Sequence, residues 1–339
     1  MSVTLFSSVE RPKPTRRWAL KVLGAALVVG PATGALIAYV PRPEVLRWEG
    51  VSLGGPAQME LWHPNPSHAQ RVLYKLRAEI ERLEAIFSLY RHDSEIAQLN
   101  QYGVLHAPSE DFRAVLTHAL DLARVSGGAF DPTVQPLWRL YDAHFRRDPD
   151  AARGPSAAIV GKTLTTVGHG GVEMSAGLIS FARPGMGLTL NGVAQGYITD
   201  RIAAILLHEG FEHAIVDIGE TRAIGEAPQG HPWSIGVKDP QNPLVANRAI
   251  EIVNQAVSVS GGYGTPFGSS DSHHIFDPRT GLSARQMLDV AVTAPRAMEA
   301  DGLSTAIYVG GEDAGKKLLA HYRGASATIT RLDGAIVAL

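Results

Sequence analysis

The stretch LTLNGVAQGYITDRIAAILLHEGF, residues 188–211, contains the junction around which the fold is expected to form. LTLN begins like a buried strand, and the chain turns into a helix at the small, flexible Asn191-Gly192. The polar side chains gather at this junction and not at the far end of the helix: Asn191, Gln195, Tyr197, Thr199 and Asp200. The sequence therefore predicts a strand that leads directly into a helix, with a polar cluster where the two meet.

Further helices and strands are expected on both sides of the junction. Ser67 and Ser109 are the expected N-caps of helices ending near Phe87 and at Gly127-Gly128. Other helices are predicted over 192–210, 297–310 and 312–323. Strands are predicted in VSLGGPAQMELWHP (51–64), GVEMSAGLISFA, LTLN, AIVDIG, WSIGVKD, RAIEIV, QAVSVSG, HHIFD, DVAVTAP, AIYVGG and a closing hairpin in SATITRLDGAIVAL. The expected fold class is α+β, with mixed sheets flanked by helices in two lobes around a cleft.

Composition excludes several classes of protein. The 339 residues are 45% hydrophobic and 19% charged, which is ordinary for a globular chain of one or two domains. With 31 basic and 33 acidic residues the formal charge is −2, which argues against a nucleic-acid partner because such proteins carry a basic surface. The chain has no cysteine, so disulfides, thiolate metal sites and cysteine nucleophiles are excluded.

The N-terminal segment indicates export. In RPKPTRRWALKVLGAALVVGPATGALIAYVPRP, residues 11–43, an arginine pair precedes the apolar stretch Val22–Val40. This pattern resembles a twin-arginine signal, although the apolar stretch is also close to the length of a membrane anchor. We expect residues 1–45 to be a twin-arginine-type signal or N-terminal anchor with a linker, and residues 46–339 to form the functional domain. Both alternatives place that domain outside the cytoplasm, and the periplasm is the expected location.

The segment SGGAFDPTVQPLW, residues 126–138, has a structural and a functional interpretation. Two glycines followed by an aromatic residue, an acid and a proline fit the end of a helix and a turn. The same residues also fit a loop whose backbone approaches a ligand, with Phe130 packing and Asp131 accepting a hydrogen bond.

Two adjacent histidines in SHHIFDPRTGLSA, residues 272–284, are a second candidate. In a strand, His273 and His274 would point to opposite faces. One would then be a solvent or rim residue, and the other would line a site or serve as a satisfied structural histidine.

The segment APRAMEADGLSTAIYVGG, residues 294–311, suggests a metal site. Asp301 and Thr305 are four residues apart, so on a helix they share a face. A carboxylate and a hydroxyl are oxygen ligands of the kind that Mg²⁺ binds, whereas Ser304 lies off that face. The alternative is a helix in which Asp301 is solvated and Thr305 bonds back to its own backbone.

Several common catalytic signatures are absent from the sequence. The chain contains no GxxxxGK[ST], HExxH or GxSxG pattern. The glycines of GGYGTPFG, residues 261–268, do not follow the dinucleotide-binding spacing.

Taken in order, these segments resemble the FAD:protein FMN transferase family, also called ApbE proteins. The resemblance covers roughly residues 50–320 and rests on EAIFSLYRHDSEIAQLN, SGGAFDPTVQPLW, LTLNGVAQGYITDRIA, AIVDIGE, WSIGVKDP, AVSVSGGY, HIFDPRTG and APRAMEADGLSTAIYVGG. It implies a flavin cleft and an Mg²⁺-dependent reaction that splits the pyrophosphate of FAD. The FMN phosphate is then transferred to a threonine or serine of an acceptor protein, and AMP leaves.

The resemblance also implies roles for individual residues. Asp301, Thr305 and the carbonyl of Gly192 correspond to metal ligands, and His274 to the general base. The corresponding FAD-binding positions are Tyr90, Ala129, Phe130, Asp131, Thr189, Gln195 and Phe276. On this interpretation the polar strand-to-helix junction meets a pyrophosphate and its metal at the positive end of the helix.

Two positions depart from the family pattern. Where the family usually has LDLGGIAKGY, this chain has Thr189 in place of the aspartate and Gln195 in place of the lysine. An anion and a cation are lost together, so the local charge is expected to be unchanged. The wording LNGVAQGYITDR resembles a branch that includes the flavin donor of nitrous-oxide reductase maturation. The implied acceptor is a membrane-bound regulator with a flavin domain.

Two other functions remain open on the sequence alone. The changes at Thr189 and Gln195 would suit an FAD-binding carrier that does not turn FAD over. The same cleft would also suit an FAD pyrophosphatase that releases free FMN without an acceptor.

Overall fold

The computed structural model describes residues 44–242, 244–268 and 272–339. The predicted signal or anchor therefore lies outside the described residues, apart from its last two positions. Within the described part, no helix is both long enough and apolar enough to cross a membrane.

An eight-stranded antiparallel sheet forms the centre of the molecule, with strand order β1-β2-β6-β7-β10-β11-β12-β13. Its strands are β1 (Glu44–Ser52), β2 (Gly55–His63), β6 (His213–Asp217), β7 (Thr221–Ile224), β10 (Ala256–Gly261), β11 (Asp289–Ala294), β12 (Ser326–Thr330) and β13 (Ile336–Ala338). Two small antiparallel sheets accompany it. They consist of β3 (Val104–His106), β5 (Leu178–Phe181) and β4 (Val172–Met174), and of β8 (Trp233–Lys238) and β9 (Ala246–Ile252).

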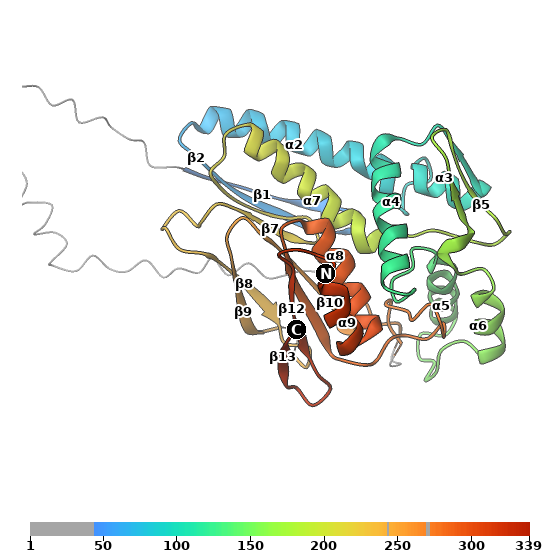
Figure 1. Cartoon of the computed structure of the whole chain (residues 1–339). Helices are drawn as coiled ribbons and strands as arrows, with labels where there is room; N and C mark the ends of the chain where they lie inside the picture. The colour runs from blue at the N-terminus through green and yellow to red at the C-terminus, as the bar shows by residue number, and fades with distance from the viewer. Residues whose placement is uncertain (1–43, 243, 269–271) are drawn as a thin grey trace, which may run out of the picture.

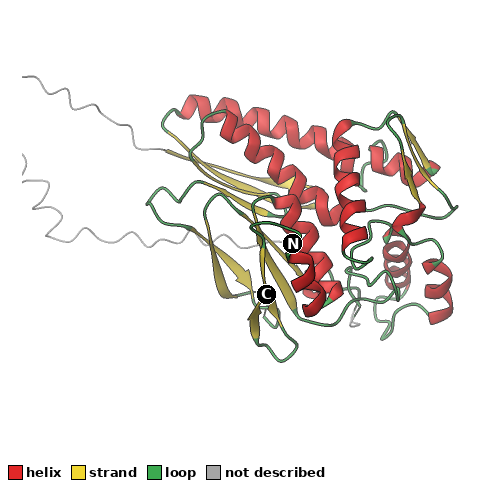
Figure 2. Cartoon of the chain, viewed as in Figure 1, coloured by secondary structure: helices red, strands yellow, loops and turns green. Residues whose placement is uncertain are grey.

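The long helices cover one face of the main sheet (Figure 1). The helices are α2 (Pro66–Phe87), α3 (Glu95–Tyr102), α4 (Glu110–Val125), α5 (Gln135–Arg147), α6 (Ala157–Leu164), α7 (Asn191–His208), α8 (Ala297–Gly310) and α9 (Glu312–Leu319), with 3₁₀ turns η1 (His169–Gly171) and η2 (Gly262–Gly264). Figure 2 shows these helices and the main sheet as separate layers, with α3–α6 and the three-stranded sheet gathered at one end. The α+β expectation is confirmed, but every strand pair is antiparallel rather than mixed in direction.

Side-chain alternation along β10 explains how the sheet separates two cores. Val257 and Val259 belong to a core shared with the β8–β9 sheet. Ala256 belongs to the main core on the helical face. Because alternate residues of a strand point to the same face, Ser258 and Ser260 also face the helices. β10 therefore presents two hydroxyl groups to α8, which packs against it.

The predicted strand at the junction does not form. Residues 186–190 belong to no helix or strand. Their hydrogen bonds go instead to a side chain and a loop. The Asn100 amide pairs with the N–H and carbonyl of Leu188 at 2.6 and 2.8 Å, and the Thr189 N–H donates to the Pro132 carbonyl at 2.8 Å. These bonds tie the segment before α7 to Asn100 of α3 and to the loop that follows α4.

Other local predictions were partly right. Ser109 caps α4 as expected, by accepting from the Phe112 N–H, but the cap of α2 is Asn65 and not Ser67. The closing hairpin and the β1–β2 hairpin are confirmed. AIYVGG was wrong as a strand because it continues α8, and HHIFD forms only isolated bridges. Helices α3, α5 and α6 were not predicted.

Helices α7 and α8 cross at very close range, and this crossing aligns the site. A Cβ on Gly196 would lie 2.4 Å from the Ala297 carbonyl oxygen, so only glycine fits there. The Asp200 carboxylate accepts from the N–H groups of Ala297 and Met298 at 2.9 and 3.1 Å. It thereby caps α8, which has no side-chain cap of its own. Asp200 also pairs with Arg222.

Gly196→Ala is expected to destabilise the fold by about 2 kcal/mol, because the added methyl group overpacks two backbones that cannot move independently. Guanidinium unfolding measures this change. Gly161→Ala is the matched control, since Gly161 lies in α6 and a Cβ there meets nothing within 4 Å. This control should be neutral or stabilising by less than about 1 kcal/mol. Equal unfolding free energies for the two variants would contradict the close crossing.

Candidate active site

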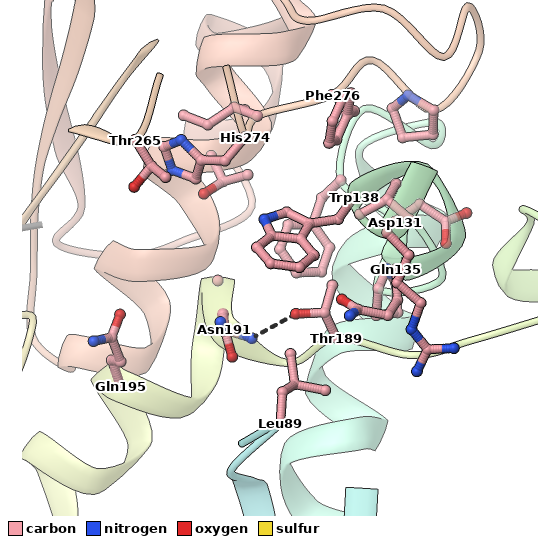
Figure 3. Close-up of a pocket in the computed structure, with 18 of the residues that line it drawn as sticks. Leu89, Asp131, Gln135, Trp138, Thr189, Asn191, Gln195, Thr265, His274 and Phe276 are labelled. Atoms are coloured by element: carbon pink, nitrogen blue, oxygen red, sulfur yellow. Dashed lines mark hydrogen bonds between the residues drawn. The ribbon is translucent and has the colours of Figure 1, made fainter. Parts of the chain in front are cut away.

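A pocket of about 620 Å³ opens between the start of α7, the middle of α8, the loop after α4 and the segment after η2 (Figure 3). All the site residues predicted from the sequence line it: Tyr90, Ala129, Phe130, Asp131, Thr189, Gly192, Gln195, His274, Phe276, Asp301 and Thr305. The volume lies within the range of small-molecule sites. Segments separated by more than 200 residues of sequence therefore converge on one cavity.

The first turn of α7 lines the pocket with Asn191, Gly192 and Gln195 (Figure 3). Its N-cap residue, Leu190, makes no side-chain cap hydrogen bond, and its first turn carries no acidic residue. The N-terminus of a helix concentrates partial positive charge and N–H donors, so this end favours an anionic group.

Asp301 and Thr305 project from successive turns of α8 toward the start of α7. The Asp301 carboxylate accepts from the Gly196 N–H at 3.2 Å. A Cβ on Gly192 would lie 3.6 Å from Thr305 Oγ1, which places this part of α7 beside the hydroxyl. The predicted shared face is therefore observed. Thr305 contacts Ser260 Oγ at 3.2 Å, and the bond back to the helix is made by its neighbour, Ser304.

Two buried acids face the pocket without a basic partner. Asp301 and Glu220 are each 4% exposed, and neither forms a salt bridge within the described ranges. Burial raises the pKa of Asp301. Burial first, and the neighbouring Asp301 charge second, raise the pKa of Glu220 well above its usual value. A cation in this part of the pocket would relieve both effects.

The donor set suits a hard cation that keeps several ligands of its own. One carboxylate, one hydroxyl and one backbone carbonyl are few protein oxygens, as Mg²⁺ prefers when it also binds phosphates and water. No group of three histidine, cysteine or acidic side chains that could hold a metal occurs in the described part of the chain. Asp301, Thr305 and the Gly192 carbonyl therefore fit Mg²⁺ better than a zinc-type site.

The loop 129–132 lines the pocket, but the Asp131 side chain has a structural task. Its carboxylate accepts from the N–H and hydroxyl of Thr133 at 2.8 and 2.5 Å, and from the N–H and Nδ1 of His169 at 2.8 and 3.0 Å. These four bonds hold the loop shape from within. Asp131 accepts hydrogen bonds as expected, but the donors are Thr133 and His169 of the protein. A ligand here would therefore contact the loop backbone.

The two histidines occupy different environments, and one expectation about them was wrong. His273 is buried rather than at the rim. Its Nε2 lies 2.7 Å from the Ala284 carbonyl, and its Nδ1 accepts from the Ile275 N–H at 3.3 Å. His274 lines the pocket, and its buried Nδ1 has no hydrogen-bond partner. Burial lowers the pKa of His274 to about 4, so its imidazole is neutral near neutral pH.

Aromatic side chains provide the apolar part of the pocket. Tyr90 is 70% exposed at the rim, whereas Phe130 and Phe276 are buried in the wall. Trp138 lies in the middle of the lining in Figure 3 and was not assigned from the sequence. Trp138 lies in the first turn of α5, so predicting that helix from the sequence would have drawn attention to it. Its indole offers a flat surface for a planar ring system.

Thr189 and Gln195 do not behave as replacements for a charge pair. Thr189 Oγ1 accepts from the Asn191 N–H at 3.3 Å (Figure 3). The Gln195 amide instead packs on the turn that leads to Glu220, because a Cβ on Gly219 would lie 2.3 Å from Gln195 Nε2. The neutral amide of Gln195 therefore leaves the Glu220 side of the pocket without a cation. Glu220 and Ser260 also line the pocket and were not identified from the sequence.

Comparisons with known proteins agree with this geometry. The family model described as "ApbE family" matches residues 53–329. The chain is 31% identical to the FAD:protein FMN transferase of Haemophilus influenzae, over 70% of this chain and 72% of the relative. It is 32% identical to that of Treponema pallidum, over 73% of this chain and 74% of the relative. The ApbE protein of Thermotoga maritima superposes with a TM-score of 0.77 at 28% identity, covering 87% of this chain and 97% of the other. The apo flavinyl transferase ApbE of Pseudomonas stutzeri superposes with a TM-score of 0.74 at 25% identity, covering 88% and 95%.

Proposed function

The chain belongs to the ApbE family and is a flavin transferase, and from this premise we propose how its pocket moves FMN from FAD to an acceptor protein. The proposal rests above all on one observation. Asp301 and Thr305 of α8 meet the start of α7 in a single pocket. The two buried acids of this pocket, Asp301 and Glu220, have no basic partner there. This arrangement supports an Mg²⁺ site beside a helix N-terminus that favours the FAD pyrophosphate.

The transfer exchanges the phosphoanhydride linkage of FAD for a phosphoester linkage to the acceptor. The bond between the FMN phosphorus and the oxygen bridging to AMP breaks, and a bond forms between that phosphorus and the acceptor hydroxyl oxygen. Mg²⁺, when bound, stabilises negative charge on the pyrophosphate. The chain's own residues orient the reactants: α7 holds the phosphates at its N-terminus, and Trp138 and Tyr90 provide surfaces for the flavin ring. His274 accepts the proton of the acceptor hydroxyl at its ring nitrogen, and AMP departs.

Mn²⁺ binding, used as a probe of the Mg²⁺ site, is expected to weaken as the pH falls below about 7. Burial raises the pKa of Asp301 to about 7 from an ordinary 3.8, so below this pH an incoming cation must displace a proton. The affinity should then fall by as much as about tenfold per pH unit for each proton displaced, and Glu220, whose pKa burial also raises, adds to the fall. Titration of free Mn²⁺ by electron paramagnetic resonance measures this dependence. A constant affinity down to pH 5 would contradict a buried Asp301 as ligand.

The cleavage of FAD gives a direct test of the cation and of the reaction together. With FAD and an acceptor protein that carries a flavinylation motif, the full chain should release AMP in the presence of Mg²⁺. EDTA should stop the release, and excess Mg²⁺ should restore it. AMP release that persists in EDTA would remove the cation from the proposal, and bound FAD that yields no AMP would indicate a carrier.

Export to the periplasm is proposed from the arginine pair and the apolar stretch that follows it. Replacing Arg16 and Arg17 together by lysine is expected to leave the protein in the cytoplasm, because the twin-arginine route reads that pair. Cell fractionation followed by immunoblotting measures this, and an unchanged periplasmic fraction would contradict the route. A protein that remains with the membrane after export would indicate an uncleaved anchor.

The acceptor is proposed to be a membrane-bound flavin-domain regulator of nitrous-oxide reduction. This rests on the wording LNGVAQGYITDR alone. Labelling of that regulator's flavin domain by this chain and FAD would support the assignment, and labelling only of unrelated acceptors would contradict it.

A further inference from the structure

Four hydroxyl side chains form a continuous hydrogen-bonded cluster between β10 and α8, which we call the hydroxyl cluster: Ser258, Ser260, Ser304 and Thr305. Ser304 Oγ lies 2.9 Å from Ser258 Oγ and 2.8 Å from Ser260 Oγ. Ser260 Oγ lies 3.2 Å from Thr305 Oγ1. The three serines are at most 4% exposed, whereas Thr305 and Ser260 also line the pocket.

The direction of each bond in this cluster follows from counting hydrogens. A hydroxyl group has one hydrogen to donate and two lone pairs to accept with. Ser304 donates its hydrogen to the Asp301 carbonyl at 2.9 Å, so it must accept from Ser260. Since Ser260 has then used its only hydrogen, it must accept the hydrogen of Thr305.

This ordering has a consequence for Thr305. A threonine in the middle of a helix commonly turns its hydroxyl hydrogen back to the carbonyl four residues earlier, which is Asp301 here. Ser304 makes the bond to that carbonyl instead. With its hydrogen directed to Ser260, Thr305 keeps both lone pairs of Oγ1 on the pocket side, which is the orientation that a hydroxyl needs in order to bind a cation.

We propose that Ser260 is a positioning residue that orients the Thr305 hydroxyl for a divalent cation by accepting its hydrogen. This inference rests on the proposed cation site. Groups that fix the orientation of a metal ligand typically change metal affinity 10- to 100-fold when removed. Because Ser260 acts only through Thr305, its effect should disappear when the Thr305 hydroxyl is absent.

The test is a double-mutant cycle on the full chain, with Mn²⁺ as the probe and electron paramagnetic resonance as the readout. Ser260→Ala should weaken Mn²⁺ binding about tenfold. In a Thr305→Val background, the same Ser260→Ala change should weaken it by less than about twofold, since the two changes are then not independent. Ser52→Ala is the matched control, because Ser52 is a buried serine at the end of β1 that does not line the pocket and whose hydroxyl has no hydrogen-bond partner within the described residues. It should leave Mn²⁺ affinity within about twofold of the parent protein.

Each outcome of the cycle has a definite meaning. Equal weakening by Ser260→Ala in both backgrounds would overturn the proposal, because it would show a general structural effect. No weakening in the parent background would overturn it as well. Melting temperatures of all variants separate loss of folding from loss of binding. If the parent protein itself fails to bind Mn²⁺, the cation site of the proposed function fails and this inference fails with it, whereas an unchanged Ser260→Ala beside a binding parent refutes this inference alone.

Discussion

Asp301→Asn is expected to lower the rate of FMN transfer on the order of 10³-fold. Asparagine keeps the shape of the side chain and can still accept from the Gly196 N–H, so the crossing of α7 and α8 should survive. What is lost is a buried negative charge that has no other cation to balance it. The stabilisation of a divalent cation is therefore removed, while the melting temperature should not fall.

The measurement is the initial rate of AMP release from FAD with acceptor present, at saturating Mg²⁺. Asp313→Asn is the matched control, because Asp313 is exposed in the first turn of α9 and does not line the pocket. The control should keep the parental rate. An Asp301→Asn protein that transfers FMN at more than about a tenth of the parental rate would remove this carboxylate from the cation site.

His274→Ala is expected to slow transfer by about 10²- to 10⁴-fold while FAD still binds, which is the usual contribution of a general base. Its imidazole lines the pocket, and its buried Nδ1 has no partner within the protein. His208→Ala, in the exposed last turn of α7, is the control and should be neutral. Equal rates for the parent and His274→Ala proteins at saturating FAD would exclude His274 as the base.

The pH profile gives a second check on the same histidine. Burial lowers the pKa of His274 to about 4 in the unliganded protein, so kcat/KM for FAD should show no loss from its protonation until the pH falls to about 4. Bound FAD brings negative charge into the pocket and favours the imidazolium form, which raises that pKa. The acid limb of kcat should therefore lie at higher pH than the acid limb of kcat/KM, and His274→Ala should abolish the difference.

The parts of the site that could be predicted are those set by local spacing. Asp301 and Thr305 share a face because four residues are about one turn of a helix, and α8 forms where it was expected. The glycine pair Gly127-Gly128 also predicted the end of α4, and both glycines have positive φ in the structure. Resemblance to a family, and not local spacing, indicated His274 and the residues that contact FAD.

The parts that could not be predicted depend on long-range partners. LTLN was predicted to be a strand, but its hydrogen bonds are taken by Asn100 and the loop carbonyl of Pro132, which no local pattern reveals. Glu220 is a single acid after a strand, and its position near Asp301 arises only when folding buries it there.

Helix α5, in contrast, was detectable from the sequence, since Leu137, Tyr141 and Phe145 are spaced four residues apart and buried.

Gln195 stands where the family usually has a lysine, and its contacts show what the replacement changes in the pocket. Its amide packs against Gly219 on the Glu220 side of the pocket, not against Thr189. With no lysine charge near Glu220 and Asp301, a cation bound at the proposed site would supply more of the compensation for their charges. We therefore expect the activity of this chain to depend more steeply on the Mg²⁺ concentration than it would with a lysine at position 195.

The most direct test of the account is to incubate the full chain with FAD, Mg²⁺ and an acceptor protein that carries a flavinylation motif. Flavin fluorescence of the denatured acceptor on a gel is then measured together with AMP. The account predicts fluorescence on the acceptor, loss of that signal when its threonine is replaced by valine, and one AMP for each flavin attached. AMP with free FMN and an unlabelled acceptor, in an assay where an established flavin transferase labels the same acceptor, would contradict it.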